Sequence, residues 1–253
     1  MTFRSALTGA LTLLCTSFLS LPATALNLEL MSPAEREIFR AEVRDYLMEN
    51  PEVILEAVDA LRQRQAQAEA MSEQSLVQVN SDAIFNDGFS WVGGNPDGDI
   101  TIVEFMDYRC GYCKKAFPEV TGMIEDDGNI RIIVKEFPIL GDASVLASRF
   151  AIATKIIAGN QAYKDVHTAL MTMRGDVSET SLRRIASSLS LDSTAIFAGM
   201  ASDEVNRILQ ANRELGQRLR VSGTPTFVMQ DQLVRGYVPA EAMAEIVAEL
   251  RRN

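Results

Sequence analysis

The chain has 253 residues and a formal net charge of −10 at pH 7, with 47% hydrophobic and 23% charged residues. These proportions are typical of a globular protein with one or two domains and a sizeable core. The negative charge argues against nucleic acid or an anionic membrane surface as the partner. Aromatic residues make up only 7% of the chain, too few for a nucleic-acid-binding face.

Residues 1–25 are predicted to be a cleavable signal peptide. A mostly apolar segment follows Arg4, and Ala23-Thr24-Ala25 has the pattern of an A-x-A cleavage site. The apolar segment is short for a membrane span, which needs about 20 residues. We therefore expect an exported protein in an oxidising compartment, where disulfide chemistry has substrates.

Residues 26–85 are predicted to form a separate helical region. Ser32–Glu35 has the pattern of a capping box with proline at the first helical position. An apolar stripe at helical spacing follows: Ile54, Ala57, Val58 and Leu61. The next stretch, Arg62–Ala70, favours a helix but has almost no apolar face. We expect either a homo-oligomer formed through residues 33–79 or a helix folded back on its own domain.

Two cysteines, Cys110 and Cys113, lie where a predicted buried strand, Ile100–Phe105, gives way to a helix. The first turn of a helix has unpaired backbone N–H groups and the positive end of the helix dipole. A thiolate placed there is stabilised, so its pKa falls below the roughly 8.5 of a free cysteine. Cys110 is therefore the candidate nucleophile, and Cys113 can close a disulfide with it. Such a pair accepts or donates two electrons by thiol–disulfide exchange.

A metal site is the alternative interpretation of the two cysteines. A structural zinc site needs about four ligands, whereas the chain has only three cysteines and one histidine. The methionines Met106, Met171 and Met173 could join the cysteines around a soft metal such as copper. Methionine at these spacings usually fills a core instead. The only histidine, His167, is expected to be structural or solvated.

The remaining chain, residues 86–253, is predicted to be one α/β domain. Residues 86–98 are expected to be a linker, and Asn129–Phe137 a second strand. Strand, helix and strand at this spacing predict a parallel βαβ unit. Residues 142–220 are predicted to be all helical, with a break at Gly159-Asn160. A hairpin over Thr226–Tyr237 and a last helix, Ala240–Arg252, complete the domain.

A proline at the start of the hairpin, Pro225, has two interpretations. Proline removes a hydrogen-bond donor from a strand, so an ordinary trans proline would open an edge strand there. A cis Thr224-Pro225 bond is the other interpretation, although only about 5% of X-Pro bonds in folded proteins are cis. The residues alone leave both open.

Taken as a set, these motifs resemble the DsbA-like thioredoxin-fold oxidoreductases of the bacterial periplasm, and most of all their ScsC-like branch. The resemblance covers roughly Gly94 to Asn253 and rests on Asp107–Lys115, Val134–Gly141 and Gly223–Phe227. The segment Glu37–Gln67 is also similar to the N-terminal region of ScsC-like proteins. The implied fold is a thioredoxin fold with a helical insertion, preceded by an N-terminal helical arm.

The resemblance also implies roles for individual residues. Cys110 and Cys113 would form the redox-active disulfide, Cys110 attacking and Cys113 resolving. Pro225 would be a cis-proline that faces the pair, and Thr224 would offer backbone hydrogen bonds to a substrate segment. Glu104 occupies the position of the family's buried acid. It would either relay the proton of Cys113 or form a buried pair with Lys135, and the two roles can coexist.

The dipeptide between the cysteines, Gly111-Tyr112, departs from the Pro-His of strongly oxidising family members. It carries no cation, so we expect a less oxidising disulfide with isomerase or reductase character. Gly111 and Tyr112 are candidate substrate-binding residues beside Thr224 and Pro225. The substrates would be unfolded or misfolded exported proteins, a membrane redox partner would reset the pair, and no cofactor is implied. A copper-handling or chaperone-type binding protein is the rival hypothesis.

Overall fold

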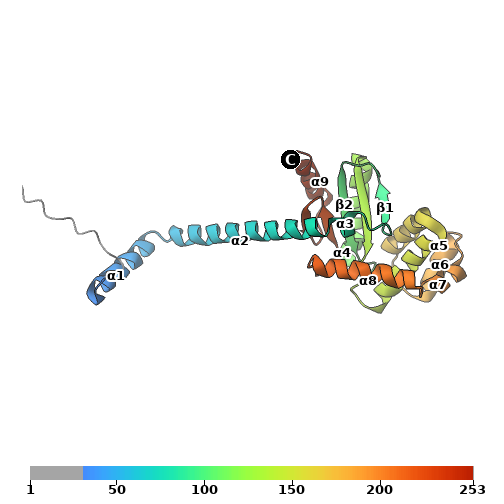
Figure 1. The fold of residues 1–253 in the computed structure, drawn as a ribbon, viewed down its shortest axis with the longest axis horizontal. Helices are drawn as coiled ribbons and strands as arrows, with labels where there is room; N and C mark the ends of the chain where they lie inside the picture. The colour runs from blue at the N-terminus through green and yellow to red at the C-terminus, as the bar shows by residue number, and fades with distance from the viewer. Residues whose placement is uncertain (1–30, 253) are drawn as a thin grey trace, which may run out of the picture. The chain divides into compact units, whose positions relative to one another are not determined.

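The computed structural model describes residues 31–252, so the predicted signal peptide and Cys15 lie outside the described residues. Contacts divide the chain into two compact units, one ending at Leu61 and one beginning at Arg62 (coloured by residue number in Figure 1). The second unit begins before residue 86, where the sequence places the domain, because Val77 and Ile84 belong to its core. In the described part of the chain, no helix is both long and apolar enough to cross a membrane.

The first unit contains helix α1 (Pro33–Glu49) and the start of α2 (Glu52–Val79). The predicted capping box is present: the Ser32 hydroxyl accepts a hydrogen bond from the Glu35 N–H at 3.3 Å, and the Glu35 carboxylate accepts one from the Ser32 N–H at 2.8 Å. No residue of α1 is buried. Large apolar side chains of this unit are exposed: Ile38, Phe39, Tyr46, Ile54, Leu55 and Leu61.

The second unit is built around a sheet of five strands in the order β1-β3-β2-β4-β5. The strands are β1 (Trp91–Gly94), β2 (Ile100–Met106), β3 (Ile130–Glu136), β4 (Thr226–Met229) and β5 (Gln232–Arg235). Strands β2 and β3 are parallel, as the βαβ pattern predicts, and every other pairing is antiparallel. The central position of β2 matters for function because β2 leads into Cys110.

Strand β1 corrects the prediction of a linker over residues 86–98. Its last two residues, Gly93-Gly94, are typical of a turn when read locally, yet they pair with Ile132 and Arg131 of β3. A strand of four residues at the edge of a sheet is stabilised mainly by hydrogen bonds to the neighbouring strand. The strand propensity of its own residues contributes less. The sequence pattern of β1 alone therefore could not predict it.

Helices cover both faces of this sheet (Figure 1). One face packs against α4 (Gly111–Asp127), α5 (Asp142–Thr172) and α9 (Ala240–Leu250), through buried residues such as Val120, Phe150 and Val247. The other face packs against the end of α2, α3 (Ser81–Phe85) and α8 (Asp203–Arg218). The sheet is therefore apolar on both sides, and the charged residues Glu104 of β2 and Lys135 of β3 are buried in it.

The predicted helical insertion lies between β3 and β4. It consists of α5, α6 (Glu179–Ser188), α7 (Ser193–Gly199) and α8, and the first three gather beside the sheet in Figure 1. The predicted break at Gly159-Asn160 is confirmed: Gly159 has φ +86° and ψ −177° inside α5. That backbone conformation is readily available to glycine and strained for other residues, so the second half of α5 takes its own direction.

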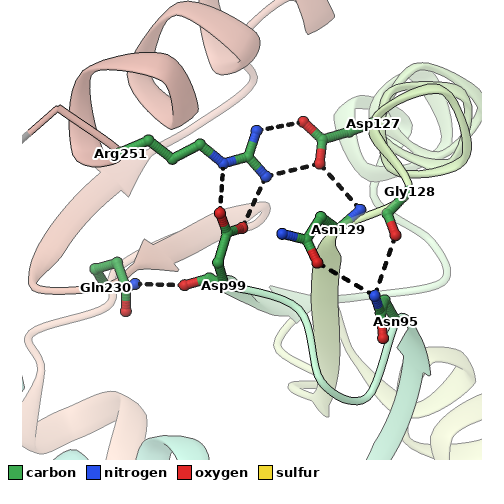
Figure 2. A network of polar contacts seen from close by, with 7 residues as sticks. All are labelled: Asn95, Asp99, Asp127, Gly128, Asn129, Gln230 and Arg251. Atoms are coloured by element: carbon green, nitrogen blue, oxygen red, sulfur yellow. Dashed lines mark hydrogen bonds and ion pairs between the residues drawn. The ribbon is translucent and has the colours of Figure 1, made fainter.

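Arg251, just past the end of α9, contacts carboxylates from two other parts of the fold (Figure 2). They lie near the start of β2, whereas the cysteines follow the end of that strand. The Arg251 guanidinium donates to the Asp99 carboxylate at 2.9 and 2.8 Å and to the Asp127 carboxylate at 2.6 and 2.8 Å. Asp99 precedes β2 and Asp127 ends α4. Two bidentate ion pairs therefore hold the last helix against the βαβ unit.

Candidate active site

The two cysteines lie at the N-terminus of α4, directly after the central strand β2. Cys110 is the N-cap residue, and its sulfur accepts a hydrogen bond from the Cys113 N–H at 3.3 Å. Both cysteines are free thiols, Cys110 being 7% exposed and Cys113 fully buried. The Cys110 sulfur therefore lies at a helix start, the part of a helix where unpaired backbone N–H groups are found.

The Thr224-Pro225 peptide bond is cis, which settles the two interpretations of Pro225. Strand β4 follows this bond and pairs antiparallel with β2. The pairing brings Thr224 beside the cysteines: the Cys110 thiol donates to the Thr224 carbonyl oxygen at 3.1 Å. The structure therefore brings together Cys110, Cys113, Thr224 and Pro225, as the resemblance implies.

Glu104 lies on β2 behind the cysteines and is 3% exposed. Its Oε1 atom has no hydrogen-bond partner in the described structure. Burial raises the pKa of Glu104 to about 8. Burial also raises the pKa of Cys113, and the charge of Glu104 raises it further. The protonation states of Glu104 and Cys113 are therefore coupled.

The predicted pairing of Glu104 with Lys135 is wrong. Lys135 is fully buried, but its ammonium donates to the Asp87 carboxylate and, at 3.0 Å, to the Ala83 carbonyl. In the β2–β3 register Glu104 lies opposite Val134, so the next residue of β3, Lys135, points to the other face of the sheet. Glu104 thus forms no ion pair with any described residue, and burial favours its protonated form.

A cavity of about 370 Å³ lies on the same face of the sheet as Glu104. Its walls include Trp91, Phe117 and Val120, and Glu104 and His167 both line it. Lys164 and Gln161 of α5 also line it, so the cavity has polar as well as apolar walls. A cavity of this size with polar groups can hold several waters, which gives Glu104 a route for proton exchange other than past the cysteines.

A second buried carboxyl, Glu136, was missed by the sequence analysis. Its Oε1 accepts hydrogen bonds from the hydroxyls of Tyr108 at 2.7 Å and Tyr163 at 2.6 Å. The Tyr108 hydroxyl also lies 3.0 Å from Nδ1 of His167. Burial raises the pKa of Glu136 to about 7 and lowers that of His167 to about 4.

His167 is therefore buried and structural rather than solvated, and its ring belongs to the Tyr108–Glu136–Tyr163 cluster. The cluster connects α5, which carries His167 and Tyr163, to the turn just before Cys110, which carries Tyr108. The available sequence signal was Glu136 itself, an acidic residue in the apolar run of β3. Its tyrosine partners are distant in sequence, so only the fold identifies them.

The residues between the cysteines are exposed. An added Cβ at Gly111 would meet no atom within 4 Å, so packing does not require glycine there. The Tyr112 ring is 64% exposed and stacks on Tyr237, with the ring centroids 6.3 Å apart. Tyr237, in the loop between β5 and α9, was not among the predicted site residues. The side chains of Tyr112 and Tyr237 can therefore contact a polypeptide that reaches Cys110.

The methionines weighed as metal ligands divide between core and surface. Met106 and Met171 are buried among apolar side chains, as core-filling residues are, and Met173 is partly exposed. Across residues 31–252, no group of three or more histidine, cysteine, aspartate or glutamate side chains is arranged to hold a metal ion. The two thiols are thus the reactive groups that the site brings together.

Known proteins share both parts of this architecture. Residues 101–248 match the DSBA-like thioredoxin domain, and residues 35–68 match the copper resistance protein ScsC N-terminal domain. A thioredoxin-like oxidoreductase from Silicibacter pomeroyi is 40% identical, covers 69% of this chain and 99% of its own, and has a TM-score of 0.65. A linker-deletion mutant of Proteus mirabilis ScsC is 26% identical, with 88% and 99% coverage and a TM-score of 0.67.

A curated relative is a longer protein. The Na⁺/H⁺ antiporter NhaA 3 of Salinispora tropica is 27% identical over 156 residues, which are 62% of this chain and 24% of that protein. The chain thus spans about a quarter of the length of that relative. The match to the DSBA-like domain covers more than half of the present chain, including β2, the cysteines and the cis-proline. The chain therefore belongs to the DSBA-like thioredoxin-domain family, with an N-terminal segment of the ScsC type.

Proposed function

We propose that this protein is an exported thiol–disulfide oxidoreductase that acts on protein thiols and disulfides through Cys110 and Cys113. The observation that carries this proposal is the position of the Cys110 sulfur. It caps a helix, accepts the Cys113 N–H and lies 3.1 Å from the Thr224 carbonyl beside a cis-proline. A helix start can stabilise a thiolate released during exchange. The Thr224 carbonyl belongs to a strand-like backbone to which a substrate can bind.

In the oxidising direction, a substrate thiolate attacks the Cys110 sulfur of the Cys110–Cys113 disulfide. The bond between the two cysteines breaks, Cys113 leaves as a thiolate, and a mixed disulfide forms. A second substrate thiolate attacks the substrate sulfur of that mixed disulfide and releases the Cys110 thiolate. The substrate gains one disulfide and loses two electrons, and the protein gains two thiols. A membrane partner would then reoxidise the pair.

In isomerisation, the Cys110 thiolate attacks a non-native substrate disulfide and is released when another substrate thiol resolves the mixed disulfide. No net electrons are transferred. The Gly111-Tyr112 dipeptide supports this direction, because it places no cation between the cysteines. The disulfide should then be less oxidising than that of a dedicated oxidase.

Glu104 is proposed to carry the proton of Cys113. Cys113 must lose its proton when it attacks a mixed disulfide, yet burial raises the pKa of this thiol. Glu104, with a pKa of about 8, exchanges protons near neutral pH and faces a cavity that admits water. A proton can therefore leave while a substrate covers Cys110.

The substrates would be unfolded or misfolded exported proteins, bound by backbone pairing at Thr224 and by apolar contact with Tyr112 and Pro225. The predicted signal peptide and the similarity to a periplasmic thioredoxin-like protein from Salmonella enterica support export. No dissociable cofactor is part of the proposal. The exposed apolar side chains of the first unit support self-association of this chain, for which Ile54, Leu55 and Leu61 are the proposed contact residues.

Trapping of mixed disulfides tests the exchange chemistry. Reduced protein carrying Cys113→Ser should accumulate covalent complexes with unfolded exported proteins, because Cys110 still attacks and no resolving thiol remains. The matched variant Cys110→Ser should form none. Equal amounts of complex from both variants, all released by reductant, would contradict the assignment of Cys110 as the attacking residue.

The direction of transfer is tested by the reduction potential. A value near that of disulfide isomerases, about −180 mV, with activity on scrambled disulfides would support isomerisation. A value near −120 mV, about that of a strong oxidase, without such activity would contradict it. Self-association is tested by the molar mass of Ile54→Lys and Leu61→Lys variants, both in the exposed apolar stripe. These variants leave the core residues Val77 and Ile84 unchanged. A smaller molar mass would therefore mean that the exposed stripe holds the copies of the chain together.

A further inference from the structure

Three cations surround the cysteine pair although the chain as a whole has a net charge of −10. Arg109 directly precedes Cys110, and Lys114 and Lys115 directly follow Cys113. Arg109 and Lys115 are exposed and Lys114 is partly exposed. Together these three residues are called the cationic rim.

Each member of the cationic rim is held by an uncharged group. The Arg109 guanidinium donates to the Leu140 carbonyl at 3.3 Å, and the Lys114 ammonium donates to the Met173 carbonyl at 2.8 Å. The Lys115 ammonium lies 4.0 Å from the ring centroid of Tyr237, a cation–π contact. The three holding groups come from three different segments, so separate parts of the fold hold the positive charges that flank the cysteine pair.

The nearby carboxylates accept hydrogen bonds from uncharged groups. Asp107 is fully buried and accepts from the backbone N–H groups of Arg109, Ile139 and Leu140, at 2.8, 2.9 and 3.0 Å. Glu119 accepts from the Tyr237 hydroxyl at 2.8 and 2.9 Å and from the Ala240 N–H at 3.2 Å. Within the described residues, no ion pair is found between a carboxylate and any member of the cationic rim.

Exposed apolar side chains lie among these charges. Tyr112 stacks on the same Tyr237 ring that holds Lys115, and Ile139 and Leu140 are 42% and 44% exposed beside the Arg109 contact. The Asp107 hydrogen bonds fix the backbone of both residues. The mouth of the site thus presents fixed apolar contacts together with three positive charges, none of which forms an ion pair with a carboxylate of residues 31–252.

We propose that the cationic rim selects polypeptide segments in which acidic residues flank the reactive cysteine. This inference rests on the proposed exchange function and specifies its substrate class. The apolar side chains would contact the segment next to its cysteine, and its carboxylates would supply the anions that the rim lacks. Fixed charges around a site act mainly on the rate of encounter and on the choice between partners.

Two synthetic dithiol peptides test this inference on the full-length oxidised protein. They are identical except that the residues flanking the first cysteine are glutamates in one and lysines in the other. The rate of protein reduction is measured for each at low and high salt. Reaction of both peptides with an uncharged small disulfide, bis(2-hydroxyethyl) disulfide, gives the ratio of their intrinsic rates. The ratio of rates measured with the protein is divided by this intrinsic ratio.

The normalised preference for the glutamate peptide should be roughly fivefold to tenfold at low salt, the scale of two or three exposed ion pairs. It should fall towards one at high salt, because exposed charges are screened. The double variant Arg109→Gln/Lys115→Gln should lose the preference at low salt. The matched control Arg213→Gln, an exposed cation on α8 at the other face of the sheet, should keep it.

Equal normalised rates for the two peptides, or a preference that survives in the double variant, would overturn the cationic rim as a selector and leave the exchange function intact. If neither peptide reduces the protein, while the folded state is verified by circular dichroism, the exchange function itself falls. The two failures are therefore distinguished by whether any exchange occurs.

Discussion

Glu104 and Lys135 are buried on opposite faces of the same sheet, although their strands are direct neighbours. Lys135 neutralises Asp87 on one face, and Glu104 lies without a cation behind Cys113 on the other. A direct pair between them would hold Glu104 ionised. Their separation lets one residue stabilise the fold while the other keeps a proton near the thiols.

Lys135→Met should be strongly destabilising. Asp87 is nearly buried, and burial works against its charge while Lys135 lowers its pKa. Removal of the ammonium leaves a buried carboxylate without its cation, which typically costs about 3–5 kcal/mol. Urea unfolding at pH 7 measures the loss.

Two further variants control the Lys135 experiment. Lys135→Met/Asp87→Asn should recover part of the loss, because the unpaired charge is gone. Arg183→Gln breaks an exposed ion pair with Glu179 and should cost less than about 1 kcal/mol. If Lys135→Met lowers the free energy of unfolding as little as Arg183→Gln does, the buried Asp87 carboxylate does not need the Lys135 ammonium for stability.

Glu104→Gln should make stability less dependent on pH. Burial raises the folded-state pKa of Glu104 from 4.5 to about 8, so the folded state binds more protons than the unfolded state between these values. Stability therefore falls as pH rises through this window. The variant removes this slope and should gain about 3 kcal/mol relative to the parent between pH 5 and pH 8.

Unfolding free energies at several pH values check the Glu104 prediction. If the difference in unfolding free energy between parent and variant stays constant from pH 5 to pH 8, Glu104 does not titrate in this window. The proposed proton relay would then lose its basis. The relay itself predicts that Glu104→Gln slows the resolution of mixed disulfides more than their formation, because resolution needs the Cys113 proton to leave.

Tyr163→Phe removes one of the two hydroxyls that hydrogen-bond to Glu136. A lost hydrogen bond to a buried group costs about 1–3 kcal/mol. The hydroxyl lowers the pKa of Glu136 against the effect of burial, so the pKa should rise above about 7 in the variant. The stability loss should then be larger at pH 8 than at pH 5, since the carboxylate form has lost a donor.

Thermal unfolding at pH 5 and pH 8 measures the Tyr163→Phe effect. Thr168→Ala in the same helix is the matched control, because its hydroxyl bonds only to a carbonyl within α5 and is exposed. A loss that is the same at both pH values would mean that Glu136 does not titrate between them.

Arg251→Gln should destabilise the fold without changing thiol exchange. It removes the ion pairs to Asp99 and Asp127 (Figure 2). These carboxylates lie near the start of β2, whereas the cysteines follow the end of that strand. Partly exposed bidentate pairs are worth about 1–2 kcal/mol together. The loss should shrink in high salt, because salt screens the parent's ion pairs. Urea unfolding at two salt concentrations, together with the rate of mixed-disulfide formation, measures both effects.

Local chemistry allowed several elements to be predicted. The β2–α4 junction follows from an apolar β-branched run next to a helix-forming run, and the Ser32 cap and the Gly159 break follow from residues whose conformational preferences act over a few positions. Strand β1 was missed because its hydrogen bonds come from β3. The Glu104–Lys135 pairing was predicted wrongly because the charges match, whereas the strand register decides which face each side chain occupies.

The sequence by itself determined where the two thiols lie, because a cysteine at a helix start is a local arrangement fixed by neighbouring residues. Its resemblance to a known family added the cis-proline. Only the tertiary structure decided which charges are neutralised. It pairs Lys135 with Asp87 and gathers Tyr108, Glu136, Tyr163 and His167. It leaves Arg109, Lys114 and Lys115 without an ion pair to any carboxylate of the described chain. Electrostatic partnership depends on distances across the fold, and those distances are set by strand register and helix packing rather than by separation along the chain.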